Sequence, residues 1–98
     1  MVHLSRETVR EGLQAALAIR TGKLPTQAEL EAAPQISQWA WTDAEAGVPR
    51  LFGWVEGHPE LGTGWCTTSV VLAMDMERRW ARTVSRLYRL AEPLSPGK

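Results

Sequence analysis

The stretch Leu51-Phe52-Gly53-Trp54-Val55 is where the periodicity of the chain changes, and it decides the predicted fold. Aromatic and β-branched residues follow one another here, which is typical of a short strand. Gly53 inside the run predicts a β-bulge or a close approach of another backbone segment. Gly57-His58-Pro59 then opens a glycine-rich turn region over residues 57–64.

Two more extended segments are expected after this strand. Residues 66–74 are rich in β-branched side chains and predict a second strand. Residues 79–90 fit both a helix and a strand. A strand would place alternate residues on one face: Trp80, Arg82, Val84, Arg86, Tyr88 and Leu90. The short connection at residues 75–78 and the β-forming side chains favour the strand, so we expect a three-stranded antiparallel meander over residues 50–90.

The N-terminal third of the chain has the pattern of two helices. Apolar residues at helical spacing, with Ser5 as N-cap and Gly22 beyond the end, predict a helix over residues 6–21. Thr26 and Glu29 have the spacing of a capping box, which predicts a short helix over residues 27–32 that ends before Pro34.

We therefore expect one α+β domain over residues 1–98. A helical hairpin over residues 5–33 is expected to pack on the β-meander over residues 50–90. Residues 34–49 form a connector that Trp39 and Trp41 anchor to the fold, and residues 91–98 form a tail. The expected core consists of these residues: Val9, Leu13, Leu17, Leu30, Phe52, Trp54, Val70, Leu72, Val84 and Tyr88.

Composition narrows the class of protein. Eleven basic and eleven acidic side chains in 98 residues give no net charge that would recruit nucleic acid or an anionic membrane. The single cysteine, Cys66, cannot form an intrachain disulfide. The sequence shows no secretory signal and no apolar run long enough to cross a bilayer. We expect a cytoplasmic protein without membrane contact.

Residues 78–89 hold the most pronounced functional pattern, with five arginines and no acid. Guanidinium groups pair with carboxylates or phosphates, and aromatic faces stack on bases. The segment could therefore dock an acidic protein partner or bind single-stranded nucleic acid, although arginine stems also cover aromatic rings without any ligand. The candidate binding residues are Arg78, Arg79, Trp80, Arg82, Arg86, Tyr88 and Arg89.

No catalytic or metal-binding set is predicted. His58 lies on a turn, where its imidazole is expected to bond to backbone groups rather than act as a general base. Cys66 is expected to be a buried thiol, and Asp75 an Asx-type turn former. His3, His58 and Cys66 do not have the number or spacing of zinc ligands, so we expect no cofactor.

Several motifs together resemble a known family. They are Gly22-Lys23-Leu24-Pro25-Thr26, Glu29-Leu30, Ala33-Pro34, Gly57-His58-Pro59, Thr68-Ser69, Asp75 and the run Trp80-Ala81-Arg82-Thr83-Val84-Ser85-Arg86-Leu87-Tyr88-Arg89-Leu90. Over most of residues 20–92 the chain is similar to a domain of unknown function in small uncharacterised proteobacterial proteins. The resemblance implies a shared fold and supplies no activity. Arg79 and Ala91 stand where the family pattern has glycine.

These observations favour a non-enzymatic protein-interaction module, such as an accessory or inhibitor protein carried by a mobile element. The partner would be another protein or a second copy of the chain, since an edge strand of a small sheet is suited to dimerisation. The alternative is a nucleic-acid-binding module that uses residues 78–89.

Overall fold

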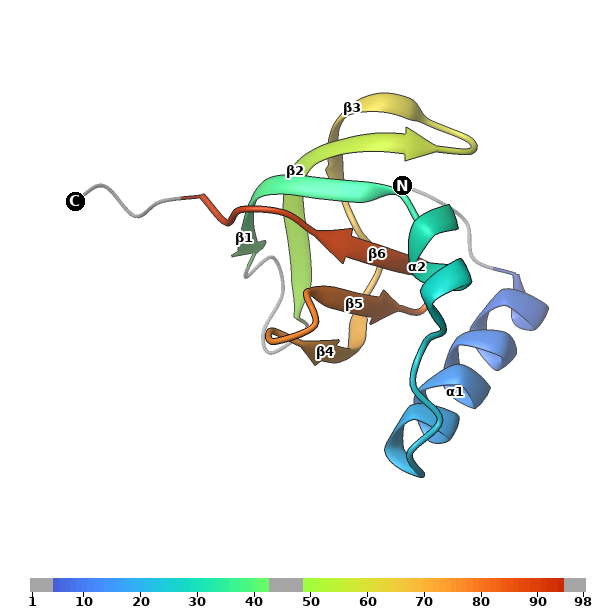
Figure 1. Cartoon of the computed structure of the whole chain (residues 1–98). Coiled ribbons are helices and arrows are strands. Elements are labelled where there is room, and N and C mark those ends of the chain that lie inside the picture. The colour runs from blue at the N-terminus through green and yellow to red at the C-terminus, as the bar shows by residue number, and fades with distance from the viewer. Residues whose placement is uncertain (1–4, 43–48, 95–98) are drawn as a thin grey trace.

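The computed structural model describes residues 5–42 and 49–94, which form two helices followed by six strands (Figure 1). The helices are α1 (Arg6–Arg20) and α2 (Gln27–Ala32). The strands are β1 (Gln35–Thr42), β2 (Arg50–His58), β3 (Gly62–Thr67), β4 (Val71–Asp75), β5 (Trp80–Thr83) and β6 (Leu87–Leu90).

The six described strands make one mixed sheet in the order β3-β2-β1-β6-β5-β4. Two antiparallel meanders, β1-β2-β3 and β4-β5-β6, join where β1 and β6 run parallel. The predicted three-stranded meander under a helical hairpin is therefore wrong. The sheet is curled, with β3 and β4 at its two ends (Figure 1). The Val71 N–H donates to the Pro49 carbonyl at 2.8 Å, which ties the start of β4 to the start of β2.

The predicted connector over residues 34–49 contains a central strand of this sheet. β1 pairs with β2 on one side and with β6 on the other. Its alternation is hidden in the sequence because a bulge interrupts it at Gln38, whose φ is +50°. The bulge turns Trp39 into the core, and Trp41 stays half exposed. Residues 43–48 of the expected connector and the end of the expected tail lie outside the described residues.

Gly53 confirms the predicted close backbone approach. A Cβ atom at this position would lie 2.8 Å from the Ser37 carbonyl oxygen and 2.8 Å from Cγ1 of Ile36. Real Cβ atoms do not come so close to backbone, so only glycine lets β2 cross the bulged part of β1 without displacement.

The second and third expected strands each divide into two. Residues 66–74 contain the end of β3 and most of β4, and residues 79–90 contain β5 and β6. The β5–β6 turn forms because Thr83 exchanges hydrogen bonds with the Arg86 backbone through both its N–H and its hydroxyl. Residues 79–90 are extended, as predicted, and not helical. The prediction that Trp80, Arg82, Val84, Arg86, Tyr88 and Leu90 share one face is wrong, because the turn breaks the alternation.

The helices begin and end close to the predicted residues, but α1 packs differently. Ser5 caps α1, and Thr26 and Glu29 form the predicted capping box of α2. Leu13 and Leu17, expected in the core, are exposed. Gly12 is the buried residue of α1, and a Cβ there would meet the Val84 carbonyl oxygen at 2.3 Å. α1 therefore approaches the β5–β6 turn through its smallest residue, against β4 and β5, whereas α2 packs on β6.

The core lies inside the curl of the sheet. Its buried residues are Ile36, Trp39, Leu51, Val55, Ala81, Tyr88 and Leu90. Of the predicted core, Val84 and Tyr88 are buried, whereas Phe52, like the two α1 leucines, is exposed. The prediction placed Phe52 and Trp54 on the inner face of β2. In the structure Leu51, Gly53 and Val55 face inward, so Phe52 and Trp54 face outward.

Candidate functional site

The structure separates the five arginines of residues 78–89 into three places. Arg78 lies on the β4–β5 turn, where it pairs with Asp75 at 2.9 Å, and Arg79 follows it with a φ of +60°. Arg89 donates from Nε to the Ala33 carbonyl at 3.2 Å, behind the end of α2. Arg82 and Arg86 line a groove between the helices and the sheet. The predicted set is therefore not one continuous surface.

The two aromatic residues of the predicted set are inside the protein. Trp80 and Tyr88 are each 2% exposed. Tyr88 packs in the core opposite Ala81, and burial raises the pKa of its hydroxyl to about 12. Neither ring offers a face to a base or to a partner side chain, because stacking requires an accessible face.

The groove has a volume of ≈ 560 Å³ and lies between α1, α2 and the start of β6. Its walls are mostly aliphatic: Ala15, Ala18, Ile19, Leu24, Pro25, Ala32, Ala33, Pro34 and Leu87. Lys23, Arg82 and Arg86 bring positive charge to it, and Glu29 is the acid among its described lining. Glu29 accepts the Thr26 N–H at 2.8 Å through Oε1 as part of the capping box, and its charge also acts on Arg82.

The two groove arginines make no short ion pair, although acids lie near both. Arg82 Nε donates to the Thr83 carbonyl at 3.0 Å, and Arg86 Nη2 lies 4.0 Å from Oε1 of the exposed Glu60. In the parts of the chain that the structure describes, neither forms another ion pair. Burial lowers the pKa of the Arg82 guanidinium, Glu11 and Glu29 raise it, and the nearby charge of Arg86 lowers it.

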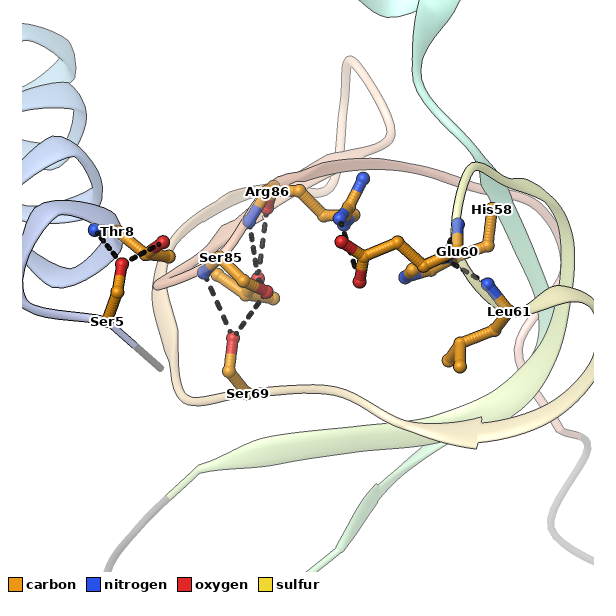
Figure 2. Close-up of polar contacts among 9 residues, drawn as sticks. Ser5, Thr8, His58, Glu60, Leu61, Ser69, Ser85 and Arg86 are labelled. Atoms are coloured by element: carbon orange, nitrogen blue, oxygen red, sulfur yellow. Dashed lines mark hydrogen bonds and ion pairs between the residues drawn. The ribbon is translucent and has the colours of Figure 1, made fainter. Parts of the chain in front are cut away.

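The turn that carries Arg86 is fixed by hydroxyl groups (Figure 2). Ser69 Oγ accepts the Ser85 N–H at 3.1 Å and lies 3.0 Å from Ser85 Oγ. The Thr83 hydroxyl donates to the Arg86 carbonyl at 3.0 Å and accepts the Arg86 N–H at 3.2 Å. These bonds hold the backbone from which Arg86 projects.

His58 has the structural role that its turn position predicts. Its Nδ1 accepts the N–H groups of Glu60 and Leu61, each at 3.0 Å (Figure 2). Burial lowers the pKa of His58, the charge of Arg86 lowers it further, and Glu60 raises it. A neutral ring whose Nδ1 is occupied by two backbone donors cannot take up a proton at that atom without breaking the turn.

Cys66 is half-buried, whereas a fully buried thiol was expected, and Asp75 accepts hydrogen bonds within a turn. Burial raises the pKa of the Cys66 thiol, which keeps it protonated and a weak nucleophile. Asp75 accepts the N–H groups of Glu77 and Arg78, each at 3.0 Å, which confirms the predicted Asx-type turn. Over residues 5–42 and 49–94, no three His, Cys, Asp or Glu side chains are grouped so that they could hold a metal ion.

The residues that sequence reasoning missed lie on the outer face of β2 and β3. Phe52 and Trp65 stack with ring centroids 5.4 Å apart and planes at 7°, and Trp54 meets Trp65 edge-on at 5.4 Å. Phe52 is 43% and Trp65 55% exposed. We call Phe52, Trp54 and Trp65 the aromatic platform. The spacing of Phe52 and Trp54 is its only sequence signal, and that signal becomes readable once β3 places Trp65 opposite Trp54.

The aromatic platform is nearly neutral and adjoins a free sheet edge. Along β2 its charged neighbours on the same face are Arg50 and Glu56, one at each end. Trp54 Nε1 donates to Glu56 Oε2 at 3.3 Å, which orients that indole. β3 is the end strand of the sheet, so among the described strands it pairs with β2 alone. Its outer edge therefore has unpaired backbone groups beside the rings.

Residues 3–95 match a family of unknown function (DUF6634), so the chain belongs to that family. The curated proteins and the solved structures contained no match. Among the residues that the structure describes, no helix is both long enough and apolar enough to cross a membrane.

Proposed function

We propose that this member of the DUF6634 family is a non-enzymatic protein-interaction module that binds an extended segment of a partner protein at the aromatic platform and the free edge of β3. The observation that supports it is the stack of Phe52 on Trp65, two large rings left about half exposed on an edge strand and its neighbour. Exposed aromatic clusters of this kind mark interaction sites, because their burial contributes most of the binding free energy in interfaces.

The chemistry around the aromatic platform favours a peptide over nucleic acid. A nucleic-acid platform combines stacking rings with a surplus of cations that track the phosphates. Here Arg50 and Glu56 cancel, and the whole chain has no net charge. A peptide instead gains backbone hydrogen bonds by adding a strand beside β3, with alternate apolar side chains against the rings.

The alternative of nucleic-acid binding through residues 78–89 stays a prediction with fewer contacts to support it. With Trp80 and Tyr88 buried, it would depend on guanidinium groups that lie in three different places.

The cytoplasm of a bacterial cell is the compartment we propose, since the free thiol of Cys66 suits a reducing environment.

Selection from a random peptide display library on the full chain tests the proposal. We expect peptides with alternating aromatic or aliphatic residues, whose affinity falls at least about tenfold in Trp65→Ser. Trp41→Ser is the matched control. Trp41 is 52% exposed, but it pairs with the inward-facing Leu51 and so lies on the opposite face of the sheet from the aromatic platform. Peptides that bind Trp65→Ser as well as wild type would contradict the proposal.

Two measurements test whether the peptide adds to the edge of β3 and whether a second copy of the chain occupies the aromatic platform instead. N-methylation of alternate peptide residues should abolish binding if the peptide adds to β3, because it removes the backbone donors. Sedimentation of the chain alone should show a monomer. A dimer that Trp65→Ser dissociates would assign the aromatic platform to a second copy of the chain instead of a partner.

A further inference from the structure

The groove under the helices is a second surface, on elements other than those of the aromatic platform, and it is built in advance of any ligand. Gly12 holds α1 against Val84, and the capping box fixes the start of α2. The Thr83 and Ser69 hydroxyls fix the turn that carries Arg86. The walls of the groove therefore need little rearrangement to accept a ligand, which lowers the cost of binding.

Three cationic residues and one acid, Glu29, line the groove, and Glu11 and Glu60 are the acids outside the lining that lie near its arginines. Arg82 and Arg86 are both partly buried and close enough for their charges to oppose each other. The Arg86 Nε atom is buried, and among the described residues no acceptor bonds to it. Among the described residues, the closest carboxylate to either guanidinium group is that of Glu60, 4.0 Å from Arg86. An anion placed between the two groups would make shorter contacts, and the planar fork suits a carboxylate.

The apolar residues of the groove indicate which kind of chemical group is attached to that anion. Ala15, Ala18 and Ile19 of α1 line the groove together with Leu24 and Leu87, all of them apolar. Inorganic phosphate would leave this aliphatic surface wet, and a neutral hydrocarbon would leave the guanidinium groups unpaired. We infer that the groove binds a small aliphatic carboxylate, with the carboxylate between Arg82 and Arg86 and the hydrocarbon chain against α1.

Calorimetric titration of the full chain with octanoate tests the inference. We expect a dissociation constant on the order of 0.1–1 mM for a ligand of this size. 1-Octanol lacks the charge and inorganic phosphate lacks the chain, so each should bind at least about tenfold more weakly. The inference is overturned if octanoate does not bind at about 10 mM, or if either comparison ligand binds as tightly as octanoate.

Variants assign the site. The double variant Arg82→Gln/Arg86→Gln should lose at least about tenfold in octanoate affinity. Arg78→Gln/Arg79→Gln removes the same charge from the β4–β5 turn and should stay within about twofold of wild type. Ala18→Phe fills the apolar wall and keeps every charge, so it decides the question if the arginine variant fails to fold. Octanoate binding retained in Ala18→Phe, or in a folded arginine variant, would reject the site.

Discussion

The aromatic platform and the groove belong to one sheet yet have opposite chemistry. The platform consists of rings on the outer face of β2 and β3, with one acid and one base at its ends. The groove has aliphatic walls and three cationic residues, under helices that cover the other end of the sheet. The cations of the groove and the exposed rings of the platform are therefore spatially separate, and the aromatic residues that the sequence combined with these arginines, Trp80 and Tyr88, are buried.

A methyl group at Gly53 should affect both surfaces, because it disrupts the packing of β1 and β2 in the sheet that carries them. The Cβ of Gly53→Ala would lie 2.8 Å from the Ser37 carbonyl oxygen. Overpacking of this kind costs about 2–3 kcal/mol of unfolding free energy. Urea unfolding followed by tryptophan fluorescence measures the loss. An unfolding free energy within about 0.5 kcal/mol of wild type would show that β1 and β2 can separate there.

Removal of the His58 side chain should weaken the platform side selectively. His58→Ala leaves the N–H groups of Glu60 and Leu61 without their acceptor in the β2–β3 turn, at a cost of about 1–3 kcal/mol. His58→Asn is the matched control, because its side-chain oxygen can accept the same Asx-type bonds and recover part of the stability. Equal unfolding free energies for the Ala and Asn variants would contradict this role of Nδ1.

The same histidine predicts a pH dependence. The pKa of His58 in the folded protein is lowered from 6.5, first by burial and then by Arg86. The unfolded chain therefore binds the proton more readily, so stability is full above pH 6.5 and falls as the pH drops through the folded pKa. Melting temperatures should fall between pH 7 and pH 5 in wild type, and less so in His58→Asn. An equal fall in both proteins would rule out His58 as the source.

A methyl group at Gly12 should affect the groove and leave the platform intact. The Cβ of Gly12→Ala would lie 2.3 Å from the Val84 carbonyl oxygen, so α1 must move away from β5. The gain in helix propensity offsets part of the strain, and we expect a net loss of about 1 kcal/mol. Hydrogen exchange should speed up in α1 and stay unchanged in β2. Faster exchange in both elements would mean that the two regions are not independent.

The smallest effect is expected at Arg79, which belongs to neither surface. Its φ of +60° is unfavourable for any residue with a Cβ. Arg79→Gly should therefore stabilise the protein by about 0.5–1 kcal/mol, part of the relief being lost to chain entropy. Binding at the platform and at the groove should not change. A destabilised Arg79→Gly would show that the Arg79 side chain has a packing role.

The sequence predicts the features of this molecule that depend on neighbouring residues. Ser5, and Thr26 with Glu29, cap the helices where expected, because a cap is completed within one turn. The close approach at Gly53 is predictable because glycine weakens a strand unless a bulge or a neighbouring backbone requires it. The Asp75 turn is predictable because its bonds reach only to Glu77 and Arg78.

Features that depend on distant pairing were not predictable. β1 lacks clear alternation because of the bulge at Gln38, so only its pairing with β2 and β6 makes it a strand. Tryptophan is usually buried, so Trp54 and Trp65 gave no sign that they shield each other on an outer face. Arg82 and Arg86 do line one surface, but a turn at Thr83 lies between them, so the alternation of a single strand did not predict it.

Amide and indole chemical shifts recorded during an octanoate titration test the separation of the two surfaces most directly. We expect shifts at Ala18, Ile19, Arg82 and Arg86, which line the groove, and none at the indole N–H signals of Trp54 and Trp65. Shifts of those two indole signals, with the groove residues unchanged, would contradict the separation.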